Sequence, residues 1–220
     1  MSENRSKSKR GYLKYIGILF LLLGLIILSI IYSPVIKAYI DYKLYPFPNK
    51  EIKIELTNGS DNITTDISKD TDTVFVDKDF GLYIPKIKAN AKVIKNIDPN
   101  NYNAYRNALV HGVVHAKGTS LPDESGNVFL FAHSTVNFYE RRQYNIYFYL
   151  LGQLEENDLV YVSYQGEIYT YKVLEFKVVK PDEVKYLGKY MDEDTLTLMT
   201  CWPVGGNSHR GIVIATRVIE

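Results

Sequence analysis

The sequence predicts an all-β domain, a closed barrel or a sandwich, that follows a single N-terminal transmembrane helix. Three observations lead to this expectation. An uncharged run of 22 residues lies near the N-terminus, about seven strand-like segments fill the 142 residues after position 78, and helical periodicity is slight in that region. Many short strands in a domain of this length are typical of barrels and sandwiches.

The first 36 residues predict a membrane anchor. The uncharged run extends from Tyr15 to Ile36, and a helix of that length would span about 33 Å, enough for a hydrocarbon core of about 30 Å. The run is too long for a signal-peptide core and no A-x-A cleavage site follows it, which favours an uncleaved anchor at 15–36 over a buried core helix. Basic residues dominate the tail 1–14, so the positive-inside rule places this tail in the cytoplasm and the rest outside.

Residues 37–78 are predicted to form a stalk, because they contain polar, turn-forming stretches at 58–62 and 70–73 and few large apolar side chains. Some of this stalk can pack on the folded domain, which we expect at 79–220. Residues 38–220 carry a net charge of about −4. The net charge of +1 for the whole chain is therefore the sum of a basic tail and a mildly acidic exterior part.

Apolar alternation with a period of two predicts the strands. They are expected at 80–85, 91–94, 128–132, 159–164, 168–179, 195–200 and 211–219. In the segment 168–179 the apolar residues change from odd to even positions, which predicts a β-bulge. Gln165-Gly166 is a plausible hairpin turn before that segment, and short helices are expected at 102–110 and 143–151.

The composition excludes several classes of protein and of binding partner. The chain is 46% hydrophobic and 23% charged, which excludes a multi-span membrane protein and general disorder. Twenty-six Lys and Arg against 25 Asp and Glu leave no basic surplus for binding phosphate backbones, so no nucleic acid partner is expected. One cysteine cannot form an internal disulfide, and a free thiol outside the cell is a candidate reactive group.

Cys201 is the candidate nucleophile, because it ends a predicted strand and is followed by a Pro- and Gly-rich loop. A thiol needs a base or a cationic neighbour to become nucleophilic. His133 follows the apolar strand 128–132, where a buried strand opens into a polar loop. Arg210 lies nine residues after Cys201, so pairing of the two flanking strands would bring both side chains to one rim, where the guanidinium can stabilise an oxyanion.

The remaining histidines give only a weak indication of a metal site. His111 and His115 have the spacing of a helical metal pair, but Gly112 and the valines between them are poor helix formers. A zinc site built from these two residues with His133 and Cys201 is an alternative that the pattern does not favour. We expect no metal or cofactor from the residues alone.

Two segments together resemble a known family. Thr197-Leu198-Met199-Thr200-Cys201 with Arg210 downstream, and the stretch 126–134 that ends in His133-Ser134 upstream, are similar to the motifs of sortases. Sortases are membrane-anchored cysteine transpeptidases, mainly of Gram-positive bacteria. Residues 81–87 and 117–122 also resemble stretches of the family, so that the likeness covers about 79–220.

The resemblance implies an eight-stranded β-barrel and cleavage of an LPxTG-like sorting signal through a thioacyl-enzyme, followed by transfer to an amine of the cell wall or of a pilin. It implies that Cys201 is the nucleophile, His133 the general acid and Arg210 the group that binds substrate and stabilises the oxyanion. Thr200 is implied as a substrate contact. Some members bind calcium, but the resemblance places no calcium ligand in this sequence.

Two alternatives stay open. An L,D-transpeptidase is also extracytoplasmic and cysteine-dependent, but that family places His-Gly directly before the cysteine, where Met199-Thr200 stands here. A membrane-tethered β-barrel that only binds a ligand would carry a structural cysteine. Within the sortases, no second hydrophobic span after Ile219 and no acidic-aromatic lid motif before position 79 argue against a pilus-polymerising type, and the subclass stays unassigned.

Overall fold

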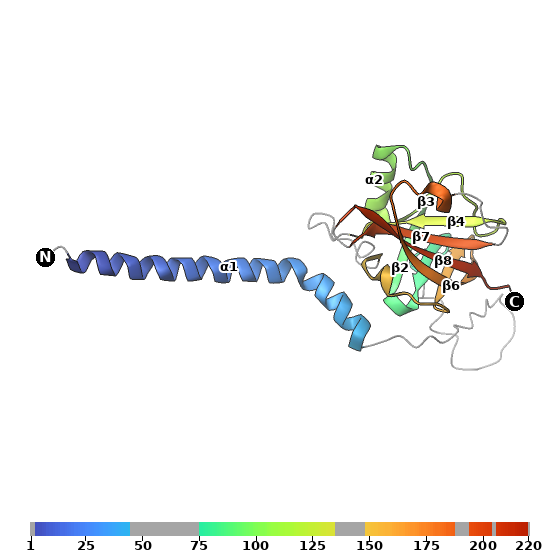
Figure 1. The fold of residues 1–220 in the computed structure, drawn as a ribbon. Coiled ribbons are helices and arrows are strands. Elements are labelled where there is room, and N and C mark those ends of the chain that lie inside the picture. Colours follow the sequence, from blue (N-terminus) through green and yellow to red (C-terminus); the bar gives the residue numbers. More distant parts are fainter. Residues whose placement is uncertain (1–2, 45–74, 135–147, 188–193, 204–205, 220) are drawn as a thin grey trace. The chain divides into compact units, whose positions relative to one another are not determined.

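The computed structural model describes residues 3–44, 75–134, 148–187, 194–203 and 206–219 (Figure 1). The strands are β1 Phe80–Ile84, β2 Ala89–Ile97, β3 Val113–Ala116, β4 Asn127–Phe131, β5 Leu159–Tyr164, β6 Glu167–Val179, β7 Thr195–Trp202 and β8 His209–Arg217. The α-helices are α1 Glu3–Leu44 and α2 Tyr102–His111, and the 3-10 helices are η2 Pro85–Ile87, η3 Phe148–Gln153 and η4 Val184–Leu187.

The eight strands form a closed barrel in the order β1-β2-β3-β4-β7-β8-β6-β5. Pairs β2–β3 and β4–β7 are parallel and the other neighbours are antiparallel. Closure removes the unpaired strand edges that would otherwise invite association. The prediction of an all-β closed barrel of eight strands is therefore confirmed.

The barrel interior is an apolar core contributed by alternate residues of each strand. On β4 and β7 these are the even-numbered positions, including Val128, Leu130, Leu196 and Leu198, which are fully or almost fully buried. Successive side chains on a strand point to opposite faces. The odd-numbered positions of β4 and β7 therefore face outward, and that outward face carries the site described below.

The bulge predicted in segment 168–179 is present in β6. The pairing of β6 with β8 shifts between Val173 and Glu175. Val173 pairs with Ala215 of the interior, whereas Val179 pairs with Arg210 on the outer face. One inserted residue thus moves the odd-numbered positions of β6 from the inside of the barrel to the outside.

Strand β3 was not predicted from the sequence. It has only four residues, Val113–Ala116, and the histidine within it interrupts the apolar pattern. Gly112 before it packs so closely on β2 that an added Cβ would lie 2.3 Å from the Lys92 carbonyl oxygen. A glycine followed by two β-branched valines was the local signal for this strand.

The helices agree with the sequence in part. Asn101 caps α2 by accepting a hydrogen bond from the Ala104 N–H (3.1 Å), and α2 covers the predicted 102–110. Of the second helix expected, 143–147 lie outside the described residues, and 148–151 belong to the 3-10 helix η3.

Helix α1 extends beyond the predicted 15–36 at both ends, and its side chains from Tyr15 to Ile30 are exposed. Among the residues that the structure describes, no helix has the length and apolarity that a membrane crossing requires. The anchor at 15–36 stays a prediction. Most of the predicted stalk lies outside the described residues.

The end of the predicted stalk packs on the barrel. One carboxylate oxygen of Asp77 accepts hydrogen bonds from the N–H groups of Asp79 (2.9 Å) and Phe80 (3.1 Å), and the other lies 2.8 Å from Lys92 Nζ. The Ser163 hydroxyl donates to the Asp77 carbonyl (2.7 Å). The chain is therefore attached to the barrel just before β1 begins.

Candidate active site

The parallel pair β4–β7 brings two predicted site residues to the same strand end. Asn127 pairs with Thr195 and Phe131 with Met199, and the Ala132 N–H continues the ladder by donating to the Met199 carbonyl (3.1 Å). His133 and Cys201 each follow this last pair by two residues, and both line the same pocket. The proximity of these residues is thus set by the pairing of two strands far apart in the chain.

Cys201 and Arg210 are direct partners across the antiparallel pair β7–β8. Residues opposite each other in such a pair point to one face, with Cβ atoms roughly 5 Å apart. Cys201 is a free, half-buried cysteine, and Arg210 is half-buried as well. Arg210 Nη1 donates to the carbonyl oxygens of Asn207 (3.0 Å) and His209 (2.9 Å), which holds the guanidinium at the start of β8.

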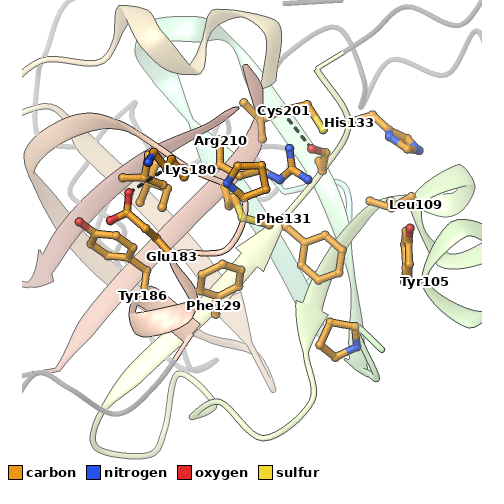
Figure 2. A pocket seen from close by; sticks show the side chains of 17 residues that line it. Tyr105, Leu109, Phe129, Phe131, His133, Lys180, Glu183, Tyr186, Cys201 and Arg210 are labelled. Carbon is orange, nitrogen blue, oxygen red and sulfur yellow. Dashed lines mark hydrogen bonds between the residues drawn. The ribbon is translucent and has the colours of Figure 1, made fainter. Parts of the chain in front are cut away.

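A pocket of about 340 Å³ extends from these residues along the outer face of the barrel (Figure 2). Its floor is apolar and consists of Phe129, Phe131, Met199 and Ile212. One wall is α2 with Tyr105 and Leu109, and the opposite wall is the segment after β6 with Lys180, Glu183 and Tyr186. The thiol, the guanidinium and the imidazole therefore stand at one end of an apolar groove.

The three side chains approach that end from different strands. In Figure 2 the Arg210 guanidinium lies on the barrel side of the pocket, and the imidazole of His133 extends toward the side of α2. Both residues line the pocket together with Cys201. The structure thus brings Cys201, His133 and Arg210 to one pocket, and their roles as nucleophile, general acid and oxyanion-binding group stay predictions.

Thr200 occupies a different position from the one its sequence neighbourhood suggests. It alternates with Cys201 along β7, is 2% exposed, and its hydroxyl donates to the carbonyl oxygen of Ala132 (3.0 Å). Ala132 directly precedes His133. The hydroxyl therefore ties the strand end that carries the thiol to the strand end that carries the imidazole, and the role as a substrate contact stays a prediction.

His115 has a structural role. It is 0% exposed, its Nδ1 accepts from the Asn96 N–H (3.2 Å), and its Nε2 lies 3.1 Å from the Ser120 carbonyl oxygen. This pattern fits a neutral ring with the proton on Nε2, because the Ser120 carbonyl can only accept. Burial lowers the pKa of His115, which keeps the ring neutral.

The metal alternative has no geometric support in the described part of the chain. His111 is exposed at the end of α2, whereas His115 is buried in β3, so they do not form a pair on one helix. No group of three or more His, Cys, Asp or Glu among the described residues is arranged to hold a metal ion.

Sequence reasoning missed the walls of the pocket. Glu183 and Tyr186 belong to the connection between β6 and β7, where the alternation ends and no motif marks them. The need for such a wall becomes visible only in the folded strands. Polar residues at the outward positions Asn127, Thr195 and Thr197 are buried, and buried polar side chains require partners from another segment.

Comparisons with known proteins agree with this geometry. A family model described as Sortase domain matches residues 82–218. The chain is 29% identical over 140 residues to "Sortase D" of Bacillus subtilis (strain 168), a match that spans 62% of each protein. The chain thus covers less than two thirds of that relative.

Two solved structures are similar in sequence as well as in fold. Sortase C-1 from Actinomyces oris is 32% identical with a TM-score of 0.54, and the match covers 66% of this chain and 76% of that one. Sortase A from Corynebacterium diphtheriae is 30% identical with a TM-score of 0.54 and coverage of 66% and 62%. The family model spans well over half of the chain and includes all three strand ends that form the site, so the protein belongs to the sortase family.

Proposed function

We propose that residues 38–220 are the extracytoplasmic part of a membrane-anchored cysteine transpeptidase that cleaves an LPxTG-like sorting signal and transfers the cleaved protein to an amine. The observation that carries this proposal is the placement of Cys201 directly opposite Arg210, with His133 at the adjacent end of the parallel strand. Membership of the sortase family supports the reaction class.

In the first half-reaction the Cys201 thiolate attacks the threonyl carbonyl carbon of the signal, and the carbonyl oxygen becomes an oxyanion. The Arg210 guanidinium lies across the strand pair from the thiol, where its N–H donors can stabilise that charge. His133 protonates the leaving amine as the carbon–nitrogen bond breaks. The products are a thioester on Cys201 and the released C-terminal fragment.

In the second half-reaction an amine of the cell wall precursor or of a pilin attacks the thioester carbonyl. The carbon–sulfur bond breaks, the amine loses a proton to His133, and the thiolate of Cys201 is restored. The two half-reactions exchange one amide bond for another. The chemistry therefore requires no metal ion and no redox cofactor.

The pocket suits the apolar part of such a signal. Its floor of two phenylalanines, Met199 and Ile212 offers contact area to leucine and proline side chains, and it ends at the thiol. An extended peptide lying along this floor would bring its threonyl carbonyl to Cys201. Thr200, whose hydroxyl is bound to the Ala132 carbonyl, would act on the substrate only through the position of its neighbours.

The location follows from the N-terminal sequence. The uncharged run 15–36 preceded by a basic tail supports a single-pass anchor, with the N-terminus in the cytoplasm and the barrel outside a Gram-positive cell. Protease added to intact cells should then remove the barrel and leave the tail 1–14 protected.

Mass spectrometry of the protein after incubation with sorting-signal peptides tests the reaction. We expect an adduct on Cys201 whose mass equals the peptide up to its threonine, and no adduct in Cys201→Ala. The absence of any adduct across a broad panel of LPxTG-like peptides would contradict the proposal. A slowly labelled thiol together with full ligand binding in Cys201→Ala would favour a binding module instead.

A further inference from the structure

A buried polar cluster lies on the pocket face, at the end opposite to Cys201. Asn127, the first residue of β4, is 3% exposed. Its Oδ1 accepts hydrogen bonds from the hydroxyls of Thr195 (3.1 Å) and Thr197 (2.9 Å) on β7. Its Nδ2 donates to the carbonyl oxygen of Tyr186 in η4 (3.0 Å). A side chain of the barrel is thereby bound to the segment that walls the pocket.

The Tyr186 carbonyl determines which way the carboxamide of Asn127 points. A hydroxyl can donate to the amide oxygen, and the Tyr186 carbonyl can only accept, so the NH₂ group must face Tyr186. Asn127, Thr195 and Thr197 lie on the outward face of the barrel, because they alternate along β4 and β7 in step with Phe129 and Met199 of the pocket floor. Tyr186 covers this face.

Tyr186 is the part of the wall that this cluster holds. Its ring packs against the outer-face cluster of Val179, Ile212 and Ile214 together with Met199. It lines the pocket, and Figure 2 shows it beside Glu183 on the side opposite to Tyr105. The backbone of η4 thus has one fixed point at the Asn127 amide and one packed side chain over the pocket floor.

We propose that Asn127 is a positioning residue, which holds η4 and the Tyr186 ring as the wall of the substrate pocket through its Nδ2–Tyr186 hydrogen bond. This inference rests on the proposed function for its kinetic consequence. Asn127 lies at the far end of β4 from His133 and is outside the reacting atoms, so its removal should weaken peptide binding more than it slows chemistry.

Asn127→Asp is the sharpest test, because it keeps size and shape and replaces the NH₂ donor by an acceptor. The carboxylate still accepts from both threonines but repels the Tyr186 carbonyl. With the peptide that acylates Cys201 best, we expect KM to rise about tenfold and kcat to change less than threefold. Asn101→Asp is the matched control, since the Asn101 oxygen accepts from the Ala104 N–H at the start of α2 and an aspartate oxygen caps a helix equally well, so both constants should stay unchanged.

Hydrogen exchange of the full chain gives a readout that does not depend on catalysis. Peptides covering η4 should exchange at least about tenfold faster in Asn127→Asp, whereas peptides from β5 should keep their wild-type protection. If Asn127→Asp fails to fold, Thr197→Val, which removes one of the two orienting hydroxyls, should show the same changes at a smaller size.

Three results would overturn the inference: unchanged exchange in η4, a fall in kcat at constant KM, or loss of protection throughout the barrel in both variants. If no peptide acylates the wild-type protein, the proposed transpeptidase reaction fails. Faster exchange confined to η4 would even then support the positioning role of Asn127.

Discussion

The two ends of the β4–β7 pair differ in how their polar groups are used. At the closed end, the Asn127 amide and the hydroxyls of Thr195 and Thr197 bind one another and η4, all of them buried. At the open end, Cys201, His133 and Arg210 are half-buried and line a pocket. The outward face of β4 and β7, continued by Arg210 on β8, therefore carries a buried polar cluster at one end and a pocket-lining polar group at the other.

The difference teaches that the degree of burial separates the two kinds of polar residue better than residue type does. The histidines show this directly. His115 on β3, opposite Leu130 of β4, is fully buried between Asn96 and Ser120, while the half-buried His133 lines the pocket. A fully buried polar group stabilises the fold through its internal partners, whereas a polar group that is half-exposed at a pocket can also contact a ligand.

The largest expected effect is at the open end. His133→Ala and Arg210→Ala should each lower kcat/KM for the sorting-signal peptide by about a hundredfold or more, since each removes an acid or a charge that acts in the transition state. The melting temperature should stay near the wild-type value. His111→Ala, which removes an exposed histidine, is the control and should retain full activity; a wild-type rate in either site variant would contradict its assigned role.

Thr200→Val tests the link between the thiol strand and the imidazole strand. The variant leaves the Ala132 carbonyl without the Thr200 hydroxyl and should lower the free energy of unfolding by about 1–3 kcal/mol. Chemical denaturation measures this loss, and Thr200→Ser should recover most of it. A change in KM at unchanged stability would show instead that the hydroxyl contacts substrate.

The pH dependence of stability tests the buried histidine. Because burial lowers the pKa of His115 below its ordinary value of 6.5, the unfolded chain binds a proton at a higher pH than the folded one. The contribution of His115 to the free energy of unfolding is therefore fully present above about pH 6.5. It declines as the pH falls toward the lowered pKa of the folded state, by at most about 1.4 kcal/mol per pH unit. His115→Gln should reduce this slope, and a slope unchanged in that variant would contradict the assignment.

A smaller effect is expected at the start of the closed end. Asp194 accepts hydrogen bonds from the Ser125 hydroxyl (2.8 Å) and the Gly126 N–H (3.0 Å) and lies 3.5 Å from Arg217. The Ser125 hydroxyl above all, then the Gly126 N–H and Arg217, lower the pKa of Asp194 from its ordinary 3.8. Its stabilisation is present above that pH and is lost as the pH falls through the lowered value.

Asp194→Asn should therefore cost on the order of 1 kcal/mol at pH 7 and almost nothing once the wild-type carboxylate is protonated. Urea unfolding at both pH values measures the difference. An equal loss in the free energy of unfolding at both pH values would mean that the charge of Asp194 contributes nothing and that only its shape matters.

The sequence predicted those features that depend on neighbours along the chain. The phase change in 168–179 is visible in a single strand, and it is the bulge of β6. Cys201 and Arg210 flank one hairpin-like loop, so their pairing followed from strand alternation alone. The position of His133 after the apolar strand 128–132 already made it a candidate, and the resemblance to sortase motifs supplied its role as general acid and the number of strands.

Features that depend on pairing between distant strands could not be predicted from the sequence. Nothing local states that β4 and β7 run in parallel with Asn127 opposite Thr195, and so neither the closed end nor the wall held by Tyr186 could be expected. Thr200 shows the opposite case. Its position one residue before Cys201 already implied the other face of the strand, yet adjacency in the motif suggested a shared role.

The bulge in β6 decides which side chains of its second half face the pocket. Val173 faces the interior and Val179, six residues later, faces outward opposite Arg210, because Leu174 is left unpaired between Val173 and Glu175. Deleting Leu174 would make Val173–Ala215 and Glu175–Ile214 successive pairs, and Glu175, Lys177 and Val179 would keep facing outward. Deleting one residue after the bulge, such as Phe176, would instead turn the part of β6 beyond it over and remove Val179 from the pocket.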